Sequence, residues 1–468
     1  MIEPGEAPTG QVLWHGRFES GPAAELMAFS QSLSFDRRLW PDEIAGSVAH
    51  VLGLAHSHIV SDAEAESIVA ALRRAGDELG AGSFVFVESD EDIHTAIERR
   101  VTELAGPTGA KLHTGRSRND QSATSVRRWM KRELLGIAGR IVELQAVLLE
   151  RARAAGGVYL PGYTHMQRAQ PVLLAHHLLA HGWALGRDVE RVLEAMARID
   201  VSPLGAGALA GSSLPLDPDF TAGELGFAAR FENSLDAVGS RDHVAEALFV
   251  LALIGIDLSR IGEEFVLWTS EEFGFARLDD AYATGSSMLP QKKNPDIAEL
   301  ARGKAGRMIG NLTGFLATMK GLPLSYNRDY QEDKEPLFDS VDQMRLGLAA
   351  VTGMVATATW VPERMQAAAD AEASSATDLA EWLVQRGMPF REAHAVVGTL
   401  VRRALAGEGS LRSLVAVHPS LGADAAALVA PGVSVTRRVT PGGAGPVPVA
   451  DQIERFANHL ARLRAALV

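Results

Sequence analysis

The stretch Gly285-Ser-Ser-Met-Leu-Pro-Gln-Lys-Lys-Asn-Pro-Asp296 stands directly before residues 297–320, which are predicted to form a long helix. Glycine and two serines favour a flexible loop, while Asn294 and Pro295 are typical of a helix cap and a first helical turn. A helix N-terminus carries partial positive charge, and Lys292 with its neighbouring lysine adds full charges there. The stretch therefore predicts a loop that binds a carboxylate, against the alternative of an ordinary solvated helix start.

The composition limits the possible functions. The 468 residues include 45 Lys and Arg against 58 Asp and Glu, giving a net charge of −13, and no compensating basic tract appears. This balance argues against a nucleic-acid or anionic-membrane partner, although local basic residues can still hold an anionic substrate. Because the chain has no cysteine, disulfides, thiolate metal sites and a cysteine nucleophile are excluded.

Two further segments bear on the location of the protein. Residues 1–20 are expected to be loosely ordered, and their polar start lacks the basic-then-apolar layout of a signal peptide. The longest apolar run, residues 247–256, is too short to span a bilayer. We therefore expect a soluble cytoplasmic protein.

Apolar residues recur at helical spacing through the middle of the chain. In residues 134–148 they stand three and four apart, which marks one face of a long helix. Similar patterns occupy residues 171–199, 243–269, 297–320 and 335–359. These segments exceed the ordinary helix length of about 11–12 residues, so we predict a five-helix bundle with faces buried on several sides, including against another subunit.

Shorter elements flank the predicted bundle. Helices are expected at residues 44–56 and 63–79, and a strand-like run at 84–88. Residues 432–448 are predicted to be a loop, and 451–467 a final helix. The predicted fold class is all-α, with three mostly helical domains at residues 1–115, 116–361 and 362–468.

Polar residues gather between these helices. His113-Thr-Gly-Arg-Ser-Arg-Asn-Asp-Gln121 contains two arginines, whose planar guanidinium groups match a carboxylate in a bidentate way; a simple polar turn is the alternative. Gly162-Tyr-Thr-His-Met-Gln-Arg-Ala-Gln-Pro171 ends in a proline that is expected to start a helix. Its His165 is a candidate general acid or base, because free imidazole titrates near neutrality. The polar run at residues 325–335, taken alone, favours a solvated connection.

Evidence for a metal or cofactor is weak. His177 and His181 stand one helical turn apart, a spacing that can bind a metal ion. No third ligand has a matching spacing, so we interpret them as packed or solvated side chains. Phosphate-binding and dinucleotide-binding glycine motifs are absent, as is the H-E-x-x-H motif. The residues indicate chemistry without a cofactor or metal, based on cationic groups, a histidine and a serine loop.

These four constellations, in this order on long helices, resemble the fumarase/aspartase superfamily and, within it, the argininosuccinate lyase family. Pro290-Gln-Lys-Lys-Asn-Pro295 is similar to the signature loop of that family, whereas fumarases and aspartases have Pro-Gly-Lys-Val-Asn-Pro there. The resemblance runs from about Leu13 to the C-terminus. It includes Phe35-Asp-Arg-Arg-Leu-Trp40, Asn233-Ser-Leu-Asp-Ala237 and Ala376-Thr-Asp-Leu-Ala380.

The resemblance implies a reversible anti β-elimination that cleaves argininosuccinate to arginine and fumarate, as in arginine biosynthesis, without a cofactor. It implies that Ser286 removes the proton beside a carboxylate and that His165 is the partner acid or base. Glu299 is implied to orient that histidine, and Lys292 to stabilise the extra carboxylate charge. The implied substrate contacts are Ser47, Arg118, Asn119, Thr164, Ser287, Asn294, Tyr326, Gln331 and Lys334.

The resemblance also implies self-association. Members of the family are homotetramers in which the central helices form a twenty-helix bundle and each active site is built from three subunits. Two alternatives stay open at this point. One is a related fumarate-releasing lyase with another amine leaving group, and the other is a catalytically silent, crystallin-like structural tetramer. The presence of Ser286, His165 and Lys292 argues against the silent protein.

Overall fold

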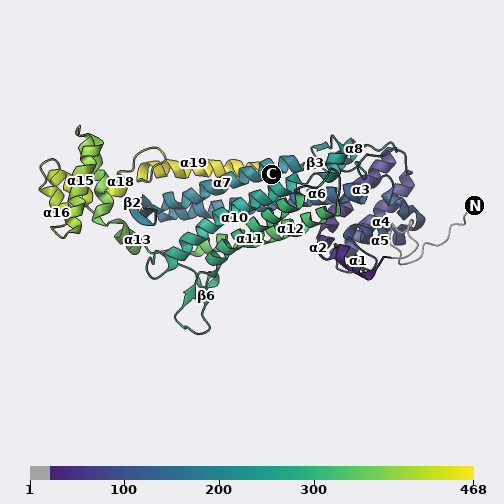
Figure 1. Cartoon of the computed structure of the whole chain (residues 1–468), viewed down its shortest axis with the longest axis horizontal. Coiled ribbons are helices and arrows are strands. Elements are labelled where there is room, and N and C mark those ends of the chain that lie inside the picture. The colour runs from purple at the N-terminus through teal and green to yellow at the C-terminus, as the bar shows by residue number, and fades with distance from the viewer. Residues whose placement is uncertain (1–21, 468) are drawn as a thin grey trace, which may run out of the picture. The chain divides into compact units, whose positions relative to one another are not determined.

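The computed structural model describes residues 22–467, so the expectation for residues 1–20 falls almost wholly outside the described part (Figure 1). Helices dominate this part of the chain, and each of its sheets has only two strands. The predicted all-α class is therefore confirmed. Within residues 22–467, no helix is both long and apolar enough to cross a membrane.

The five predicted long helices are all present. The apolar spacing that predicted the first of them produces a buried face, formed by Leu134, Ile137, Ile141, Leu144 and Leu148. Four of the five begin within three residues of their predicted starts, while the first begins well before its apolar repeat. The helices are α6 (Arg118–Ala155), α7 (Leu174–Ile199), α10 (Asp242–Thr269), α11 (Asp296–Met319) and α12 (Lys334–Thr357).

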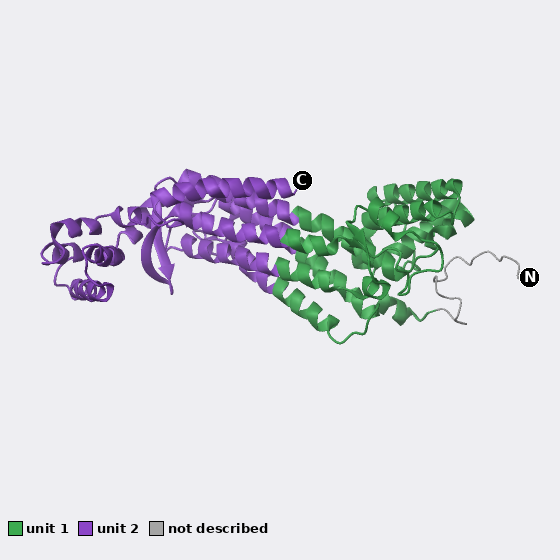
Figure 2. Cartoon of the chain, turned by 90° about the horizontal axis from the view of Figure 1, so that it is seen from above, with its two compact units in different colours: residues 1–136, 192–251, 308–342 green, residues 137–191, 252–307, 343–468 purple. Residues whose placement is uncertain are grey.

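The chain forms two compact units, which Figure 2 distinguishes by colour. Unit 1 comprises residues 1–136, 192–251 and 308–342, and unit 2 comprises 137–191, 252–307 and 343–468. Each of the five long helices contributes a part to both units. The predicted division into three domains is a different one, and it stays a prediction.

Unit 1 consists of short helices around its parts of the long ones. The predicted helices at 44–56 and 63–79 are confirmed with slightly wider bounds. The elements are α1 (Ala24–Ser30), α2 (Leu33–Asp36), α3 (Trp40–His56), α4 (Asp62–Gly80), α5 (Ile93–Ala105), α8 (Pro218–Glu224), α9 (Ser234–Gly239) and the parallel strands β3 (Val201–Ser202) and β4 (Ala229–Arg230). Three 3₁₀ segments complete it: Arg37–Leu39, Gly106–His113 and Arg328–Asp333.

The strand predicted at residues 84–88 is wrong, because this segment forms no strand. Phe84 is buried against Ala75 and Ala96, whereas Val85 is 72% exposed. A strand needs a neighbouring strand to accept and donate its backbone hydrogen bonds, and no described strand pairs with this segment. The buried ring of Phe84 attaches the irregular segment to the helical core.

Unit 2 has the remaining short helices and three antiparallel strand pairs. The helices are α13 (Pro362–Ala369), α14 (Ala376–Val384), α15 (Phe390–Leu405), α16 (Leu411–Ala416), α17 (Gly422–Ala426), α18 (Val433–Thr436) and α19 (Pro446–Ala466). The strand pairs are β1 (Tyr159–Thr164) with β2 (Gln167–Leu173), β5 (Ala276–Arg277) with β8 (Thr359–Trp360), and β6 (Thr284–Gly285) with β7 (Lys293–Asn294). Its 3₁₀ segments are Asp280–Tyr282, Glu372–Ser375 and Ala427–Val429.

Two predictions about unit 2 are wrong in detail. Pro171 does not start a helix, because it lies in β2 opposite Pro161 of β1, and α7 begins only at Leu174. The predicted loop at residues 432–448 contains α18 and the first turn of α19, which starts at a proline. Proline is tolerated both in a strand at a sheet edge and in the first turn of a helix: Pro171 occupies the first position and Pro446 the second.

Candidate functional site

The serine loop, residues 286–292, connects β6 to β7 in a short hairpin that projects from the helices of unit 2 (Figure 1). Thr284 pairs with Asn294 and Gly285 with Lys293 across the hairpin. The Thr284 hydroxyl donates to the carboxylate of Asp296 at 2.6 Å, which ties the hairpin to the first residue of α11. The predicted loop ahead of a long helix is confirmed, with the short strand β7 between the two, and its flexibility stays a prediction.

The hydroxyl oxygen of Ser286 accepts two backbone hydrogen bonds within this loop. The N–H of Leu289 donates to it at 2.9 Å and the N–H of Met288 at 3.2 Å. Two converging N–H groups favour negative charge on the oxygen that they contact. Serines in ordinary turns make similar bonds, so this geometry supports a role as base without testing it.

The two lysines of the loop have different surroundings. Lys293 donates to the Leu278 carbonyl at 2.6 Å and to the Asp280 carboxylate at 2.5 Å, so it anchors the hairpin. Lys292 is exposed, and its ammonium forms no hydrogen bond or ion pair with any residue that the structure describes. Of the two loop lysines, Lys292 is therefore the one whose ammonium is available to hold an anion.

The predicted helix cap at Asn294 is wrong. The α11 helix begins at Asp296, and the Pro295 carbonyl accepts the first helical bond from the Glu299 N–H at 3.1 Å. Asn294 instead belongs to β7, and its side-chain amide faces the Gly285 carbonyl at 3.4 Å. Asparagine serves helix caps and hairpins alike, and the strand pairing with β6 decides between them here.

Thr164 and His165 lie at the exposed end of the β1–β2 hairpin. His165 and Met166 form its two-residue turn, with φ values of 54° and 56°. A two-residue hairpin turn of this type requires positive φ at both central positions and normally uses Gly, Asn or Asp there. Two larger side chains in this conformation indicate local strain, which persists mainly at functional sites.

Glu299 lies in the first turn of α11 with its side chain exposed. No hydrogen bond or ion pair between the described residues joins it to His165, and none joins His165 to Ser286. The single chain therefore does not assemble the predicted acid–base pair. The acid–base roles of Ser286 and His165 stay predictions, and they require the association of other subunits.

In unit 1, charged side chains form a buried network around the predicted arginine motif. Glu98 accepts from Arg116 at 3.1 Å and from Arg118 at 3.2 Å. Arg118 also pairs with Asp92 at 3.0 Å, and its remaining nitrogen donates to Thr95. All three guanidinium nitrogens of Arg118 therefore have partners inside the protein, so the arginine orders this network in the structure described here.

Ser47 is fully buried within the same network. It donates to Glu43 at 2.6 Å and accepts from Arg116 at 2.8 Å. Burial raises the pKa of Glu43, but His94, Arg116 and Ser47 outweigh burial and lower that pKa to about 2. The carboxylate is thus ionised at neutral pH and holds Ser47 in place.

The polar run at residues 325–335 is less solvated than predicted. Tyr326 and Gln331 are half-buried, and Lys334 is buried with its ammonium 2.8 Å from Asp333. Asp333 also accepts from Arg241 at 2.6 Å. The interpretation as a solvated connection is wrong, because Arg241, which lies outside the run, pairs with Asp333 in the protein interior.

The structure distributes the predicted site residues between the two units. Unit 1 contains Ser47, Arg118, Asn119, Tyr326, Gln331 and Lys334. Unit 2 contains Thr164, His165, Ser286, Ser287, Lys292, Asn294 and Glu299. Asn119 donates to the Ala208 carbonyl at 3.0 Å, and Ser287 is exposed in the serine loop.

Sequence reasoning missed three carboxylates. Glu43 and Glu98 accept the charged contacts of the arginine network. Glu98 lies on the apolar face of α5 beside Ile97 and Val101, and a charged residue in such a position is a sequence signal for a buried ion pair. The third carboxylate is a potential ligand beside His177 and His181, for which no third ligand of matching spacing was evident in the sequence. Glu264 of α10 contacts both, and spacing within one helix cannot reveal a contact from another.

Comparison with known proteins shows the family to which the chain belongs. The family model described as "Lyase" matches residues 16–310, and the model described as "Argininosuccinate lyase C-terminal" matches residues 373–436. Argininosuccinate lyase from Clavibacter sepedonicus is 51% identical over 460 residues, 97% of this chain and 93% of that relative. The chain belongs to the argininosuccinate lyase family. The resemblance carried by the four constellations is thereby confirmed.

Other members and neighbours of the argininosuccinate lyase family extend this result. Argininosuccinate lyase from Symbiobacterium thermophilum is 49% identical over 455 residues, 96% of this chain and 99% of that relative. A crystal structure of EDDS lyase in complex with formate matches with a TM-score of 0.84 at 30% identity, covering 94% of this chain and 90% of that chain. The fold therefore also occurs in a lyase with a different name.

Proposed function

We propose that this lyase cleaves argininosuccinate reversibly to arginine and fumarate by anti β-elimination. A base removes a proton from the carbon beside a succinyl carboxylate, and the electron pair delocalises into that carboxylate. The bond from carbon to the guanidinium nitrogen then breaks, and an acid protonates that nitrogen. Because the carbon acid is weak, stabilisation of the doubly charged carboxylate carries most of the catalysis.

The observation that supports this reaction best is the environment of Ser286. Its oxygen accepts hydrogen bonds from two backbone N–H groups. The ammonium of Lys292, which has no partner among the described residues, belongs to the same short loop. A serine base requires stabilisation of its alkoxide, and these groups supply it. His165, which lies in a strained turn, is the proposed partner acid or base, and we propose that Glu299 orients it once the subunits assemble.

The remaining proposed contacts bind the substrate. Ser287 follows Ser286 in the serine loop, Asn294 lies on the opposite strand of the hairpin, and Thr164 precedes His165. Ser47, Arg118, Asn119, Tyr326, Gln331 and Lys334 come from unit 1. Several of these side chains already have partners inside the chain, so we expect substrate to exchange some of those hydrogen bonds rather than to meet free groups.

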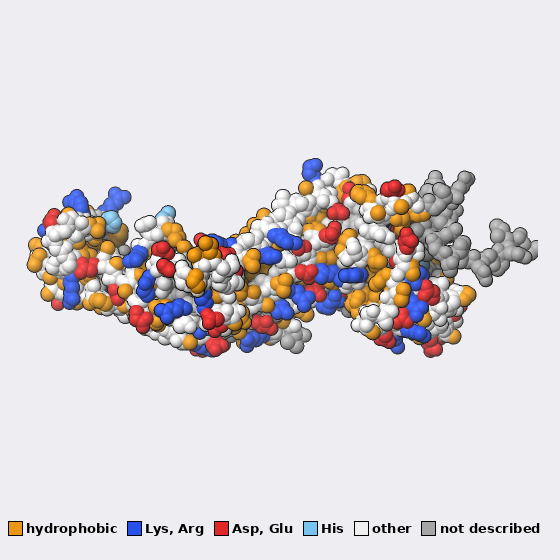
Figure 3. All heavy atoms as spheres, turned by 90° about the horizontal axis from the view of Figure 1, so that it is seen from below, with side chains coloured by type: hydrophobic (Ala, Val, Ile, Leu, Met, Phe, Trp, Pro, Cys, Tyr) orange, Lys and Arg blue, Asp and Glu red, His pale blue; other side chains and the backbone are white. Residues whose placement is uncertain are grey.

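A homotetramer, with each site shared by three subunits, is part of the proposal, as is a cytoplasmic location. Leu300, Leu316 and Leu346 are at least 50% exposed on α11 and α12, and hydrophobic side chains reach the surface drawn in Figure 3. Four helical glycines of α11 have open space where a Cβ would stand: Gly303, Gly306, Gly310 and Gly314. Each glycine costs about 1 kcal/mol relative to alanine, which close packing against another helix would offset.

A lyase with another amine leaving group is the second candidate, since the EDDS lyase structure shares this fold at 30% identity. A substrate panel separates the two candidates. Purified protein is given argininosuccinate, adenylosuccinate, aspartate or malate, and fumarate is followed by ultraviolet absorbance. Release from argininosuccinate alone is expected. Release only from another compound would support the second candidate, and silence from a folded tetramer would support the structural protein.

A further inference from the structure

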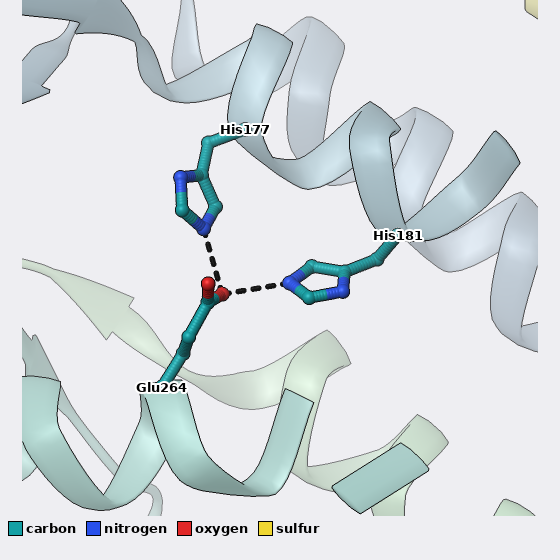
Figure 4. A group of neighbouring side chains, drawn as sticks. All are labelled: His177, His181 and Glu264. Atoms are coloured by element: carbon teal, nitrogen blue, oxygen red, sulfur yellow. Dashed lines mark hydrogen bonds and ion pairs between the residues drawn. The ribbon is translucent and has the colours of Figure 1, made fainter. Parts of the chain in front are cut away.

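Two helices of unit 2 bring three metal-ligating side chains to one point (Figure 4). His177 and His181 lie one turn apart on α7, and both point toward Glu264 of α10. The Nε2 atom of His177 is 2.6 Å from Oε2 of Glu264, and Nε2 of His181 is 2.7 Å from the same oxygen. Two imidazoles therefore converge on one carboxylate oxygen.

This cluster is distinctive within residues 22–467. It is the one group there of three His, Cys, Asp or Glu residues whose ligand atoms all lie within 4.8 Å of one another. None of its members is among the residues proposed for the elimination reaction. The three side chains are 15–32% exposed, so an ion can reach them without unfolding of the helices.

We propose that His177, His181 and Glu264 form a binding site for a divalent transition-metal ion, with Zn²⁺ as the representative ion. Two imidazoles and one carboxylate are a ligand set that zinc accepts, with water completing a tetrahedral site. Histidines four residues apart on a helix present their rings to one side, as zinc-binding helices require. Imidazole with carboxylate also suits Co²⁺, Ni²⁺ and Cu²⁺, so the shared chemistry is that of a borderline divalent ion.

The carboxylate must move to accept the ion. Ligand bonds of about 2.0–2.2 Å place tetrahedral ligand atoms roughly 3.3–3.6 Å apart, so the Glu264 oxygen must withdraw by about 0.6–1.0 Å from each imidazole nitrogen. The ion then takes the place of the protons that Nε2 of each histidine shares with the carboxylate. The ring of Trp268, with its centroid 4.9 Å from that of His177, limits rotation of that imidazole.

Binding would link α7 to α10 within unit 2. An ion that binds only the folded state stabilises that state by mass action. We therefore assign the site a structural role in the helical bundle. The proposal is independent of the elimination reaction, because the two use different residues.

The test uses the full chain without an affinity tag, after removal of metal by a chelator. Calorimetric titration with Zn²⁺ is expected to give one ion per chain, and Co²⁺ is expected to give the intense visible absorption of a tetrahedral site. Glu264→Gln and His181→Gln should each weaken binding at least tenfold. The control is His394→Gln, because His394 is an exposed histidine on α15 in the same unit.

Thermal unfolding supplies a second readout that guards against misfolded variants. Zn²⁺ should raise the Tm of the wild type and of His394→Gln, and leave that of Glu264→Gln unchanged. Glu264→Gln keeps the size of the side chain and a hydrogen-bond acceptor, so its metal-free Tm is expected to stay close to that of the wild type. Absence of Zn²⁺ binding to the wild type, or equal affinity in all variants, would overturn the proposal.

Discussion

At the scale of single residues, the two adjacent lysines of the serine loop have separate tasks. Lys292 has no partner among the described residues, whereas Lys293 binds Asp280 and the Leu278 carbonyl. Lys292→Met should lower kcat by about 10²–10³-fold with an unchanged Tm, as expected for loss of one group that stabilises a developing oxyanion. Lys293→Met should mainly increase proteolytic cleavage within residues 286–292. Equal effects on kcat would contradict this division.

Glu43 is a second residue with a defined energetic role. Its carboxylate is buried between His94 and Arg116, and its pKa is lowered to about 2. The stabilisation from this shift is fully present above about pH 4.5 and is lost as the pH falls through about 2. Glu43→Gln should cost about 3–5 kcal/mol of unfolding free energy at pH 7, because it removes the buried carboxylate that pairs with the Arg116 guanidinium and contacts the His94 ring.

Denaturant unfolding at pH 7 measures the effect of Glu43→Gln. Glu66→Gln is the matched control, since Glu66 is an exposed glutamate on α4. The acid sensitivity between about pH 4.5 and pH 2 should also be smaller in Glu43→Gln than in the wild type. A destabilisation no larger than that of the control would show that the buried network contributes little.

At the scale of elements, the packing of α7 against α10 in unit 2 contains a carboxylate with a raised pKa. Burial and the nearby charge of Asp257 raise the pKa of Asp188 to about 7, although Arg191 opposes the shift. The folded state therefore binds this proton more tightly than the unfolded chain. Its contribution to stability is fully present below about pH 4 and is lost as the pH rises through about 7.

Asp188→Asn removes this dependence. The variant should gain about 1–3 kcal/mol relative to the wild type at pH 8 and little at pH 5. Thermal unfolding at both pH values measures the difference, and Asp257→Asn should change stability in the same direction. A variant that loses stability at pH 8 would show that the bond from Arg191 outweighs the cost of the buried charge.

Some of the helices and strands could be predicted from the sequence and others could not. Hydrophobic periodicity predicted all five long helices, because each has a continuous buried face. It failed at Pro171 and at residues 84–88, where strand pairing or its absence depends on segments elsewhere in the chain. For the same reason the serine loop was predicted from local composition, whereas Glu264 and Arg241 were missed, because each contacts its partners from a separate helix.

For the whole molecule, the proposed active site requires several subunits to associate. The open glycine stripe of α11 and its exposed leucines predict that another helix packs there. Gly310→Leu should convert the tetramer to smaller species, measured by light scattering after size exclusion, and lower activity in parallel. Gly398→Leu on α15 is the control, because the space beside that glycine is also open while it lies outside the long helices. An unchanged tetramer in Gly310→Leu would place the interface elsewhere.

Ser286 is proposed to start the cleavage of argininosuccinate by removing the proton. The test compares fumarate release from argininosuccinate by the wild type and by Ser286→Ala, at matched protein concentration. We expect release by the wild type, a loss of at least about 10³-fold in kcat for the variant, and largely unchanged substrate binding. Near-normal turnover by Ser286→Ala would show that another group removes the proton.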